Sequence, residues 1–411
     1  MAASPSRVAA VLAQRAGVRK AKPGDSLRVA PDRLLLDGES GLSVASAWHE
    51  SGVKGVAAFG PRLLLVDSGR FGRRDRKGLV EFGESHRATI AVDPVTAGWP
   101  STVAVEEGLV GCNDVVMALD SEAGALGGLG VVVLRATPAE MGIAMRKRMT
   151  EVTVPDSRRV EVTGRLPRWC GPFDLAMTIV ESLGGAAMAR GRVIELFGET
   201  TASMKVDDRM ALCGALARCG VASLVLPDEA TRVWLAARRD ADGNDDGVPQ
   251  DPGAGQPAEV TVNARKTALA CVRGNAADGE RYDPCEAGGP KVTQVLIGGR
   301  LSELREAALA LSERPIHRGL HLAILPASRR VLVQLVEEGL AAQLLRAGAS
   351  IFPPGMPAPT APRREARITT VPTGGADLLC GAAVAGASAA LGCLSDPEGM
   401  RQAIRRAASL R

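Results

Sequence analysis

The chain has 411 residues, which is enough for two or three domains with separate hydrophobic cores. Apolar residues make up 46% of it and charged residues 23%, a composition typical of folded globular proteins rather than disordered ones. The 50 basic residues nearly balance the 46 acidic ones and aromatic residues are only 3%, which argues against nucleic-acid binding through basic surfaces and aromatic stacking.

A first helix is predicted near the N-terminus, with Ser6 as a possible N-cap and Val8, Val11 and Leu12 on one face. The segment has no cationic region before its short apolar stretch, so we do not expect a secretory signal. No apolar run approaches the roughly 18 residues that a membrane span needs. We therefore expect a cytoplasmic protein that does not contact a membrane.

Short apolar strands alternate with amphipathic helices along most of the chain. This alternation is typical of βαβ units in parallel or mixed sheets. The expected strands are Arg62–Val66, Ile90–Val92, Val131–Leu134, Val221–Leu226, Val295–Ile297 and Leu322–Leu325. The expected helices are Leu175–Leu183, Arg209–Cys219 and Val331–Ala347, and Leu378–Leu394 predicts a closely packed buried helix.

Three segments interrupt this pattern. The stretch Arg239–Glu259 is rich in Asp, Gly and Pro, which predicts a flexible linker or surface loop. The Pro-dense stretch Phe352–Arg364 predicts an extended connector. The glycine run Gly124–Gly130 precedes a strand, whereas a dinucleotide-binding loop follows one, so tight turns are the stronger interpretation.

The eight cysteines are scattered and no two of them form a Cys-x-x-Cys pair. This spacing suits neither a zinc site nor a redox motif, and it predicts small buried apolar side chains. His317 and His321 are four residues apart, but the Glu of an H-E-x-x-H motif is missing.

The stretch 193–229 resembles the aconitase and isopropylmalate dehydratase family. That family reads approximately I-E-F-x-G-E, then R-M-T-L-C-N-M, then P-D-E. The corresponding segments here are Ile194–Glu199, Arg209–Cys213 and Pro227–Glu229.

Shorter matches to the same family follow in the same order along nearly the whole chain. They are Pro23–Asp25 (P-G-D), Glu106–Val110 (E-x-G-L-V), Asp120–Gly127 (D-S-H-T-x-x-G-A-x-G), Ile297–Gly298 (I-G-S-C-T-N), Pro326–Arg329 (P-G-S) and Asp396–Pro397. The resemblance implies an α/β fold of three aconitase-like α/β/α domains with mixed sheets, without the C-terminal swivelling domain. We expect residues 1–290 to form the first two domains, with the flexible loop at 239–259, and residues 291–411 to form the third.

The family adds and removes water with the help of a four-iron cluster held by three cysteines. In this sequence the first of those positions falls at or near Arg300, and the other two fall at Met356 and Pro359. None of these side chains can replace a thiolate ligand. The resemblance therefore implies a member that lacks the iron–sulfur cluster and uses no other cofactor.

Most of the polar residues of the family's active site are replaced by other residues in this sequence. The resemblance implies catalytic groups at Asp67, Asp120, Ser121 and Glu122, where Glu122 stands at the position of a family histidine. It implies carboxylate-binding groups at Arg209, Arg218, Arg300, Ser328 and Arg329.

If the new charges Glu122, Arg218 and Arg300 converge, they would form a carboxylate-binding or acid–base site that needs no metal. Two alternatives stay open. Asp120 and Ser121 could simply cap a helix, and the new charges could be surface residues left by relaxed selection.

Three hypotheses for function follow. The first is a cluster-free hydro-lyase or isomerase for a small carboxylic acid, in specialised metabolism, working with a small-subunit partner. The second is a non-catalytic homologue that binds a carboxylate or stabilises a partner. The third is a site rebuilt around Cys380 with Cys393, or around Cys271 with Cys285.

Overall fold

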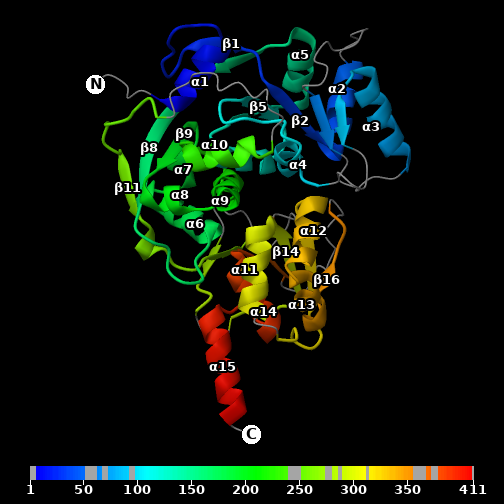
Figure 1. Ribbon diagram of the computed structural model, residues 1–411, viewed down its shortest axis with the longest axis vertical. Coiled ribbons are helices and arrows are strands. Elements are labelled where there is room, and N and C mark those ends of the chain that lie inside the picture. The colour runs from blue at the N-terminus through cyan, green and yellow to red at the C-terminus, as the bar shows by residue number, and fades with distance from the viewer. Residues whose placement is uncertain are drawn as a thin grey trace.

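The computed structural model describes residues 6–50, 63–66, 73–91, 98–238, 251–273, 280–285, 289–311, 314–354, 367–371 and 378–409. It is an α/β structure with three large sheets and one two-stranded sheet. The first two large sheets lie together at one end of the long axis and the third lies at the other (Figure 1).

The first sheet consists of five parallel strands in the order β4-β3-β2-β5-β6. Its strands are β2 (Arg33–Asp37), β3 (Leu63–Val66), β4 (Thr89–Ala91), β5 (Val115–Ala118) and β6 (Val132–Arg135). Its helices are α2 (Gly38–Glu50), α3 (Arg73–Ser85), α4 (Pro100–Glu106), the 3₁₀ helix η2 (Glu122–Leu129) and α5 (Pro138–Lys147). Leu34 and Leu36 join one core cluster and Leu35 joins another, so both faces of the sheet are buried, as expected for parallel strands.

The N-terminal helix was predicted correctly. Helix α1 (Arg7–Arg15) begins after Ser6, whose hydroxyl accepts the Ala9 N–H, and Val8, Val11 and Leu12 are buried. A two-stranded antiparallel sheet of β1 (Ser26–Val29) and β7 (Thr150–Thr153) lies in the same part of the molecule.

The second sheet has four parallel strands in the order β10-β9-β8-β11. Its strands are β8 (Asp156–Thr163), β9 (Arg192–Phe197), β10 (Ala222–Val225) and β11 (Val260–Asn263). Its helices are α6 (Pro172–Ser182), α7 (Ala186–Ala189), α8 (Glu199–Ser203), α9 (Val206–Arg218), α10 (Glu229–Ala236) and the 3₁₀ helix η3 (Ala264–Lys266). Side chains of α6 and α9 form the core of this sheet.

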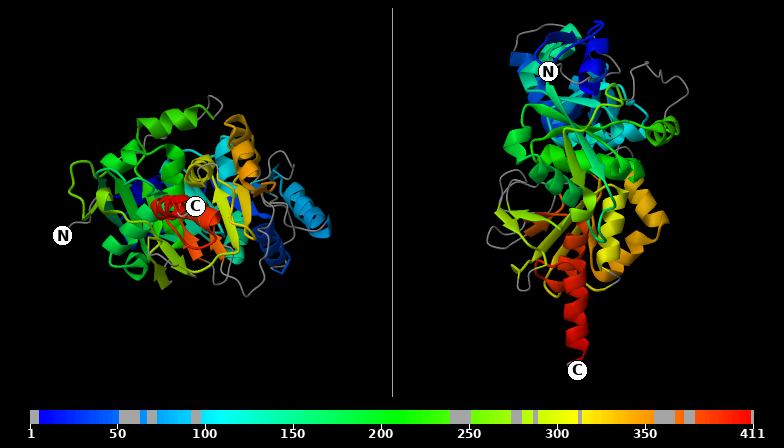
Figure 2. Two further views of the ribbon diagram at one scale, coloured as in Figure 1. Left: turned by 90° about the horizontal axis from the view of Figure 1, so that it is seen from below. Right: turned by 90° about the vertical axis from the view of Figure 1, so that its left-hand side faces the viewer.

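The third sheet is mixed and has seven strands in the order β13-β12-β18-β17-β14-β15-β16. Its strands are β12 (Cys271–Arg273), β13 (Glu280–Tyr282), β14 (Gln294–Gly299), β15 (His321–Pro326), β16 (Ser350–Ile351), β17 (Arg367–Thr369) and β18 (Leu378–Cys380). Its helices are α11 (Leu301–Leu311), α12 (Arg329–Glu337), α13 (Leu340–Ala347), α14 (Ala382–Leu391) and α15 (Pro397–Ser409). Figure 2 shows α15 projecting from the body along the long axis.

The boundary expected between residues 290 and 291 falls inside this third sheet, because β12 and β13 precede it and β12 pairs with β18. The division into domains stays a prediction. Residues 239–250 of the loop expected at 239–259 lie outside the described residues.

Two sequence interpretations need correction. The single helix predicted over Val331–Ala347 is two helices, because Gly339 has a φ of +73° between them. The predicted buried helix Leu378–Leu394 begins with a strand, β18, and only α14 is helical.

The glycines of the run Gly124–Gly130 also allow two helices to pack closely. A Cβ on Gly128 would lie 2.4 Å from the Met210 nitrogen, and one on Gly124 would lie 2.4 Å from the Ala217 Cβ. Without side chains at these positions, η2 can lie directly against α9. Among the described residues, no helix is long and apolar enough to span a bilayer.

Candidate active site

The candidate site forms where strand ends of two sheets face each other. In a parallel sheet the carboxyl ends of the strands share one edge, where α/β proteins place their functional groups. Asp120 and Glu122 follow β5 of the first sheet, and Arg300 follows β14 of the third. Ser101, near the start of α4, lies between them.

Ser101, Glu122 and Arg300 make a closed set of contacts, which we call the central cluster. The Ser101 hydroxyl donates to Glu122 Oε1 at 2.6 Å, and Arg300 Nη2 lies 3.0 Å from the same oxygen. Arg300 Nη2 also lies 3.1 Å from Ser101 Oγ. Ser101 is fully buried and Arg300 is only 4% exposed, whereas the Glu122 side chain is 25% exposed.

Arg218 adds a second, half-buried cation at the end of α9. Its Nε is buried, and no described residue accepts a hydrogen bond from it. Burial lowers the pKa of the Arg218 guanidinium, while the nearby Glu303 and Glu122 carboxylates favour its charged form. Arginine stays charged under these conditions because its pKa starts above about 12.

Glu303, in the first turn of α11, lies beside both arginines. Its Oε2 accepts the Arg300 backbone N–H at 3.0 Å. Burial raises the pKa of the Glu303 carboxyl, and the neighbouring Arg218 and Arg300 oppose that rise. Positive and negative groups therefore alternate around the central cluster, and Arg300 is the most deeply buried of these charges.

Asp120 is the acid–base candidate of the site. Its Oδ1 accepts the Ala123 N–H at 3.1 Å, which is the capping contact that the sequence left open. Burial, together with the charges of Glu122 and Asp37, raises the pKa of the Asp120 carboxyl to about 6. A carboxyl with such a pKa exists in both protonation states near neutral pH, as acid–base catalysis requires. Ser121 makes no capping hydrogen bond.

A small cavity of about 50 Å³ adjoins Arg300. A water molecule occupies roughly 30 Å³ in the liquid, so one or two waters fit. Glu106 and Asp207 contribute acids to its wall, and Arg238, Arg300 and Arg330 contribute cations. The excess of positive charge suits an anionic ligand.

Ser328 reaches this region but Arg329 does not. The Ser328 hydroxyl donates to Glu106 Oε1 at 2.6 Å and accepts the Val331 N–H at 3.1 Å, so it caps α12. Burial raises the pKa of the Glu106 carboxyl. Arg329 is exposed, and the neighbouring Arg330 contacts the Glu106 carbonyl instead.

The expected substrate contact at Arg209 is occupied by the protein itself. Arg209 is fully buried, and its two Nη atoms form a bidentate pair with Asp228 at 2.8 and 2.7 Å. Its other donors go to Thr231 Oγ1 and to the carbonyls of Ala202 and Met204. All five N–H groups are used, so this side chain holds α9 to the start of α10.

Three residues singled out from the sequence cannot be placed. Asp67 lies outside the described residues, as do Met356 and Pro359. Sequence reasoning missed the roles of Ser101 and Glu106, although Glu106 begins a segment that resembles a family motif. Their contacts join α4 to parts of the chain about two hundred residues away, which no local pattern reveals.

The described residues offer no set of three thiolates that could hold an iron–sulfur cluster. At the first cluster position, Arg300 is a cation paired with Glu122. Within the described ranges, no three His, Cys, Asp or Glu side chains are placed to hold a metal ion. Cys271 lies opposite Cys380 in the β12–β18 pair and opposite Tyr282 in the β12–β13 pair, and the site around cysteines that the third hypothesis proposed stays a prediction.

The comparisons with known proteins point to the family that the sequence motifs resemble. The aconitase family (aconitate hydratase) matches residues 79–248. The chain is 31% identical over 281 residues to the 3-isopropylmalate dehydratase large subunit of Nitratidesulfovibrio vulgaris, covering 66% of this chain and 65% of that protein.

It is 28% identical to large subunit 1 of the same enzyme from Methanopyrus kandleri, covering 83% of this chain and 82% of the relative. It is also 28% identical to large subunit 2 from Archaeoglobus fulgidus, covering 81% and 80%. The chain thus spans about two thirds of the first relative and about four fifths of the other two.

Proposed function

This chain belongs to the aconitase family, and from that premise we propose that it is a cluster-free hydro-lyase or isomerase acting on a small carboxylic acid. The observation that carries the proposal is the convergence of Asp120, Glu122, Arg218 and Arg300 from the elements of all three large sheets. The relatives named above are dehydratases, so water elimination is the first reaction to consider.

The two arginines would bind the substrate. Arg218 has no ion-pair partner closer than 4 Å among the described residues and its buried Nε has no acceptor there, so a substrate carboxylate would supply one. Arg300 is already paired with Glu122, and Ser101 holds that pair in place. A second substrate carboxylate would compete with Glu122 for Arg300.

Asp120 would move the proton. In its ionised form it can take a proton from the carbon next to a bound carboxylate, and in its protonated form it can return one. In a dehydration, the C–H proton goes to Asp120, the electron pair forms the C=C bond, and the hydroxyl leaves as water with a proton from a second acid. Burial near two carboxylates is what sets the pKa of Asp120 close to neutral.

The test is proton exchange at carbon. The purified protein is incubated in D₂O with malate, citrate and 2-isopropylmalate, in air and with a chelator, and ¹H NMR follows the C–H signals. We expect exchange or dehydration of at least one acid, lost in Asp120→Asn and unchanged by chelation. Iron and sulfide bound in stoichiometric amounts would contradict the proposal.

A non-catalytic function is the second candidate. It is favoured by the Glu122–Arg300 ion pair, because the two charges already neutralise each other without a ligand. In that case a carboxylate would raise the melting temperature without any exchange at carbon. A ligand at 100 times its Kd adds about 2.7 kcal/mol of stability, which a thermal shift detects.

A partner subunit is part of the same proposal. The relatives carry the name "large subunit", and we propose that this chain also works with a smaller protein. Co-expression with a small-subunit protein encoded nearby, followed by size-exclusion chromatography, tests it. The expected result is a complex that turns over the acids faster than the chain alone.

A further inference from the structure

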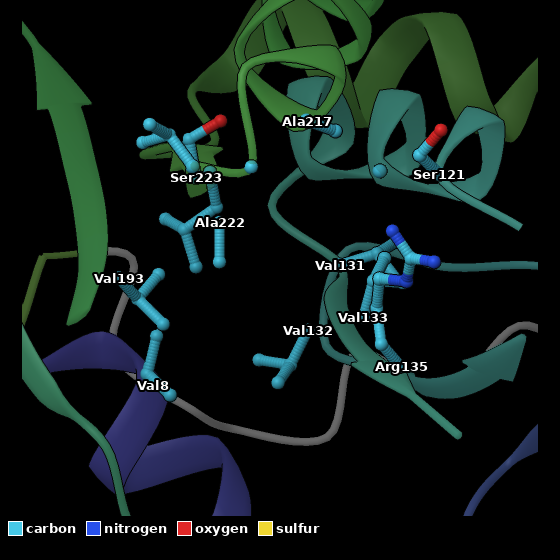
Figure 3. A pocket seen from close by; sticks show the side chains of 14 residues that line it. Val8, Ser121, Val131, Val132, Val133, Arg135, Val193, Ala217, Ala222 and Ser223 are labelled. Carbon is cyan, nitrogen blue, oxygen red and sulfur yellow. The ribbon is translucent and has the colours of Figure 1, made fainter. Parts of the chain in front are cut away.

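A second, larger cavity lies apart from the central cluster, between two sheets. It is about 240 Å³ in volume. On one side is β6, an edge strand of the first sheet, and on the other is β10, an edge strand of the second. Helix α1 closes a third side through Val8 (Figure 3).

Apart from Ser121, Arg135 and Ser223, the residues that line this cavity are aliphatic or glycine. We call it the valine pocket, after Val8, Val131, Val132, Val133, Val193 and Val221. An apolar cavity of ~150 Å³ in another protein stays dry and binds benzene, so a larger one has room for an alkyl chain. When an alkyl chain enters the pocket, apolar surface of the ligand and of the pocket wall is removed from water.

One rim of the pocket is polar. Arg135 extends from the end of β6 toward the turn that carries Ser121 (Figure 3). The Arg135 guanidinium donates from Nη2 to the Leu119 carbonyl at 3.0 Å, and no carboxylate among the described residues pairs with it. The Ser121 hydroxyl makes no hydrogen bond with any described residue. A cation and a hydroxyl with unused donors thus lie at the edge of an apolar cavity.

We propose that the valine pocket binds a short aliphatic monocarboxylate. The alkyl chain lies among the valines, and the carboxylate accepts hydrogen bonds from Arg135 and Ser121. The combination of an apolar wall with a few convergent polar groups is typical of small-ligand sites. The uncompensated charge of Arg135 selects an acid over an alcohol or an amine.

This site is separate from the one proposed for catalysis. Ser121 is adjacent to Glu122 in the chain, but the Glu122 carboxylate is directed to Ser101 and Arg300. No residue of the central cluster lines the valine pocket. The proposal therefore does not depend on the function proposed above.

The probe is sodium hexanoate, titrated into the full chain by isothermal calorimetry, with hexan-1-ol as the uncharged comparison. We expect saturable binding of hexanoate and weaker binding of the alcohol. Ala222 lines the pocket from an exposed position on β10, so Ala222→Phe should fill the pocket and weaken both ligands at least about tenfold. Arg135→Gln should weaken hexanoate about tenfold and leave hexan-1-ol unchanged.

Matched controls come from α5, where Ala139 and Arg146 are exposed. Ala139→Phe and Arg146→Gln should bind hexanoate as the unmodified chain does, and so should Arg300→Gln. In the unmodified protein, intermolecular NOEs between hexanoate and valine methyl groups give a readout that requires no variant. Absence of saturable hexanoate binding, or binding unchanged by both Ala222→Phe and Arg135→Gln, would overturn the proposal.

Discussion

At the scale of single residues, the central cluster is asymmetric in its burial. Arg300 is 4% exposed, but a quarter of the Glu122 side chain is exposed. A charge that loses its partner is costly only if it cannot reach water. The two halves of the ion pair should therefore respond differently to substitution.

Glu122→Gln should destabilise the fold more than Arg300→Met. Removing the acid leaves a buried guanidinium without its hydrogen-bonded ion-pair partner, at a cost of about 2–4 kcal/mol, whereas removing the arginine leaves a glutamate that can turn toward solvent. Urea unfolding of both single variants and of the double variant measures this difference. The double variant should recover part of the loss, and equal losses in the two single variants would contradict the argument.

Asp120 should set the acidic limb of the pH profile. Its carboxyl must be ionised to accept a proton, so kcat/KM for a turned-over acid should rise with pH through about 6 and then level off. Asp120→Asn should abolish the limb along with the activity. Glu39→Gln, an exposed substitution in the first turn of α2, provides the control. If a variant at position 120 is still active and its kcat/KM still rises with pH through about 6, another group is responsible for the acidic limb.

Arg209 should prove structural. Arg209→Lys keeps the charge but cannot make the bidentate pair with Asp228 or supply all five donors, so we expect about 2–4 kcal/mol of destabilisation. At a temperature where the variant is folded, its carboxylate affinity should match that of the unmodified chain. A selective loss of affinity without loss of stability would restore the role that the sequence suggested.

At the scale of elements, the motif residue Glu195 holds the N-terminal helix. It is fully buried in β9, and its Oε1 accepts the Ser6 hydroxyl at 2.7 Å and the Val8 N–H at 3.1 Å. The carboxylate lies at the N-terminal end of α1, where the helix dipole and the unpaired N–H groups favour a negative charge. The first helix of the chain is thus anchored to the second sheet.

Glu195→Ala should release α1. We expect about 1–3 kcal/mol of destabilisation, together with faster amide hydrogen exchange at residues 7–15. Ser6→Ala removes only the cap hydroxyl and should cost about 1 kcal/mol with a smaller change in exchange. If exchange at α1 stays the same in Glu195→Ala, the anchor is elsewhere.

The elements themselves were largely predictable, because buried parallel strands show up as apolar runs. The expected strands Arg62–Val66 and Leu322–Leu325 match β3 and β15 to within a residue at each end. The break at Gly339 was missed since the apolar pattern continues across it. Backbone conformation, rather than the pattern, ends α12.

The site was predictable only in part. Glu122, Arg218 and Arg300 were identified from the positions where a family motif changes, and the structure brings their charges near one another. Arg209 pairs with Asp228, 19 residues further along the chain, and Ser101 contacts Arg300, which is 199 residues away. Pairing over such separations cannot be read from one sequence.

At the scale of the whole molecule, Asp174 lies at the junction of the second and third sheets. It is 1% exposed in α6, and its carboxylate accepts the N–H groups of Gly171 and Ala270. Its Oδ2 also lies 3.0 Å from the position that a Cβ on Gly381, before α14, would take. Burial raises the pKa of the Asp174 carboxyl to about 7.

This raised pKa gives stability a defined pH dependence. The folded chain holds the Asp174 proton up to about pH 7, while the unfolded chain releases it near pH 4. The associated stability is fully present below about pH 4 and is lost progressively as the pH rises to about 7. Asp174→Asn should flatten this part of the profile in urea titrations between pH 4 and 8. A profile identical to that of the unmodified chain would show that another group is responsible.

The pairing of β12 with β18 has a consequence for how the chain is synthesised. Cys271 in β12 lies opposite Cys380 in β18. The edge of β12 that faces β18 therefore has no partner until nearly the whole chain has left the ribosome. Contacts so distant in sequence form slowly, and an exposed strand edge invites association with other chains. Until then, β12 and β13 form a two-stranded hairpin, which is at best marginally stable alone. Ribosome-bound chains that end before β18 should therefore be the most dependent on chaperones.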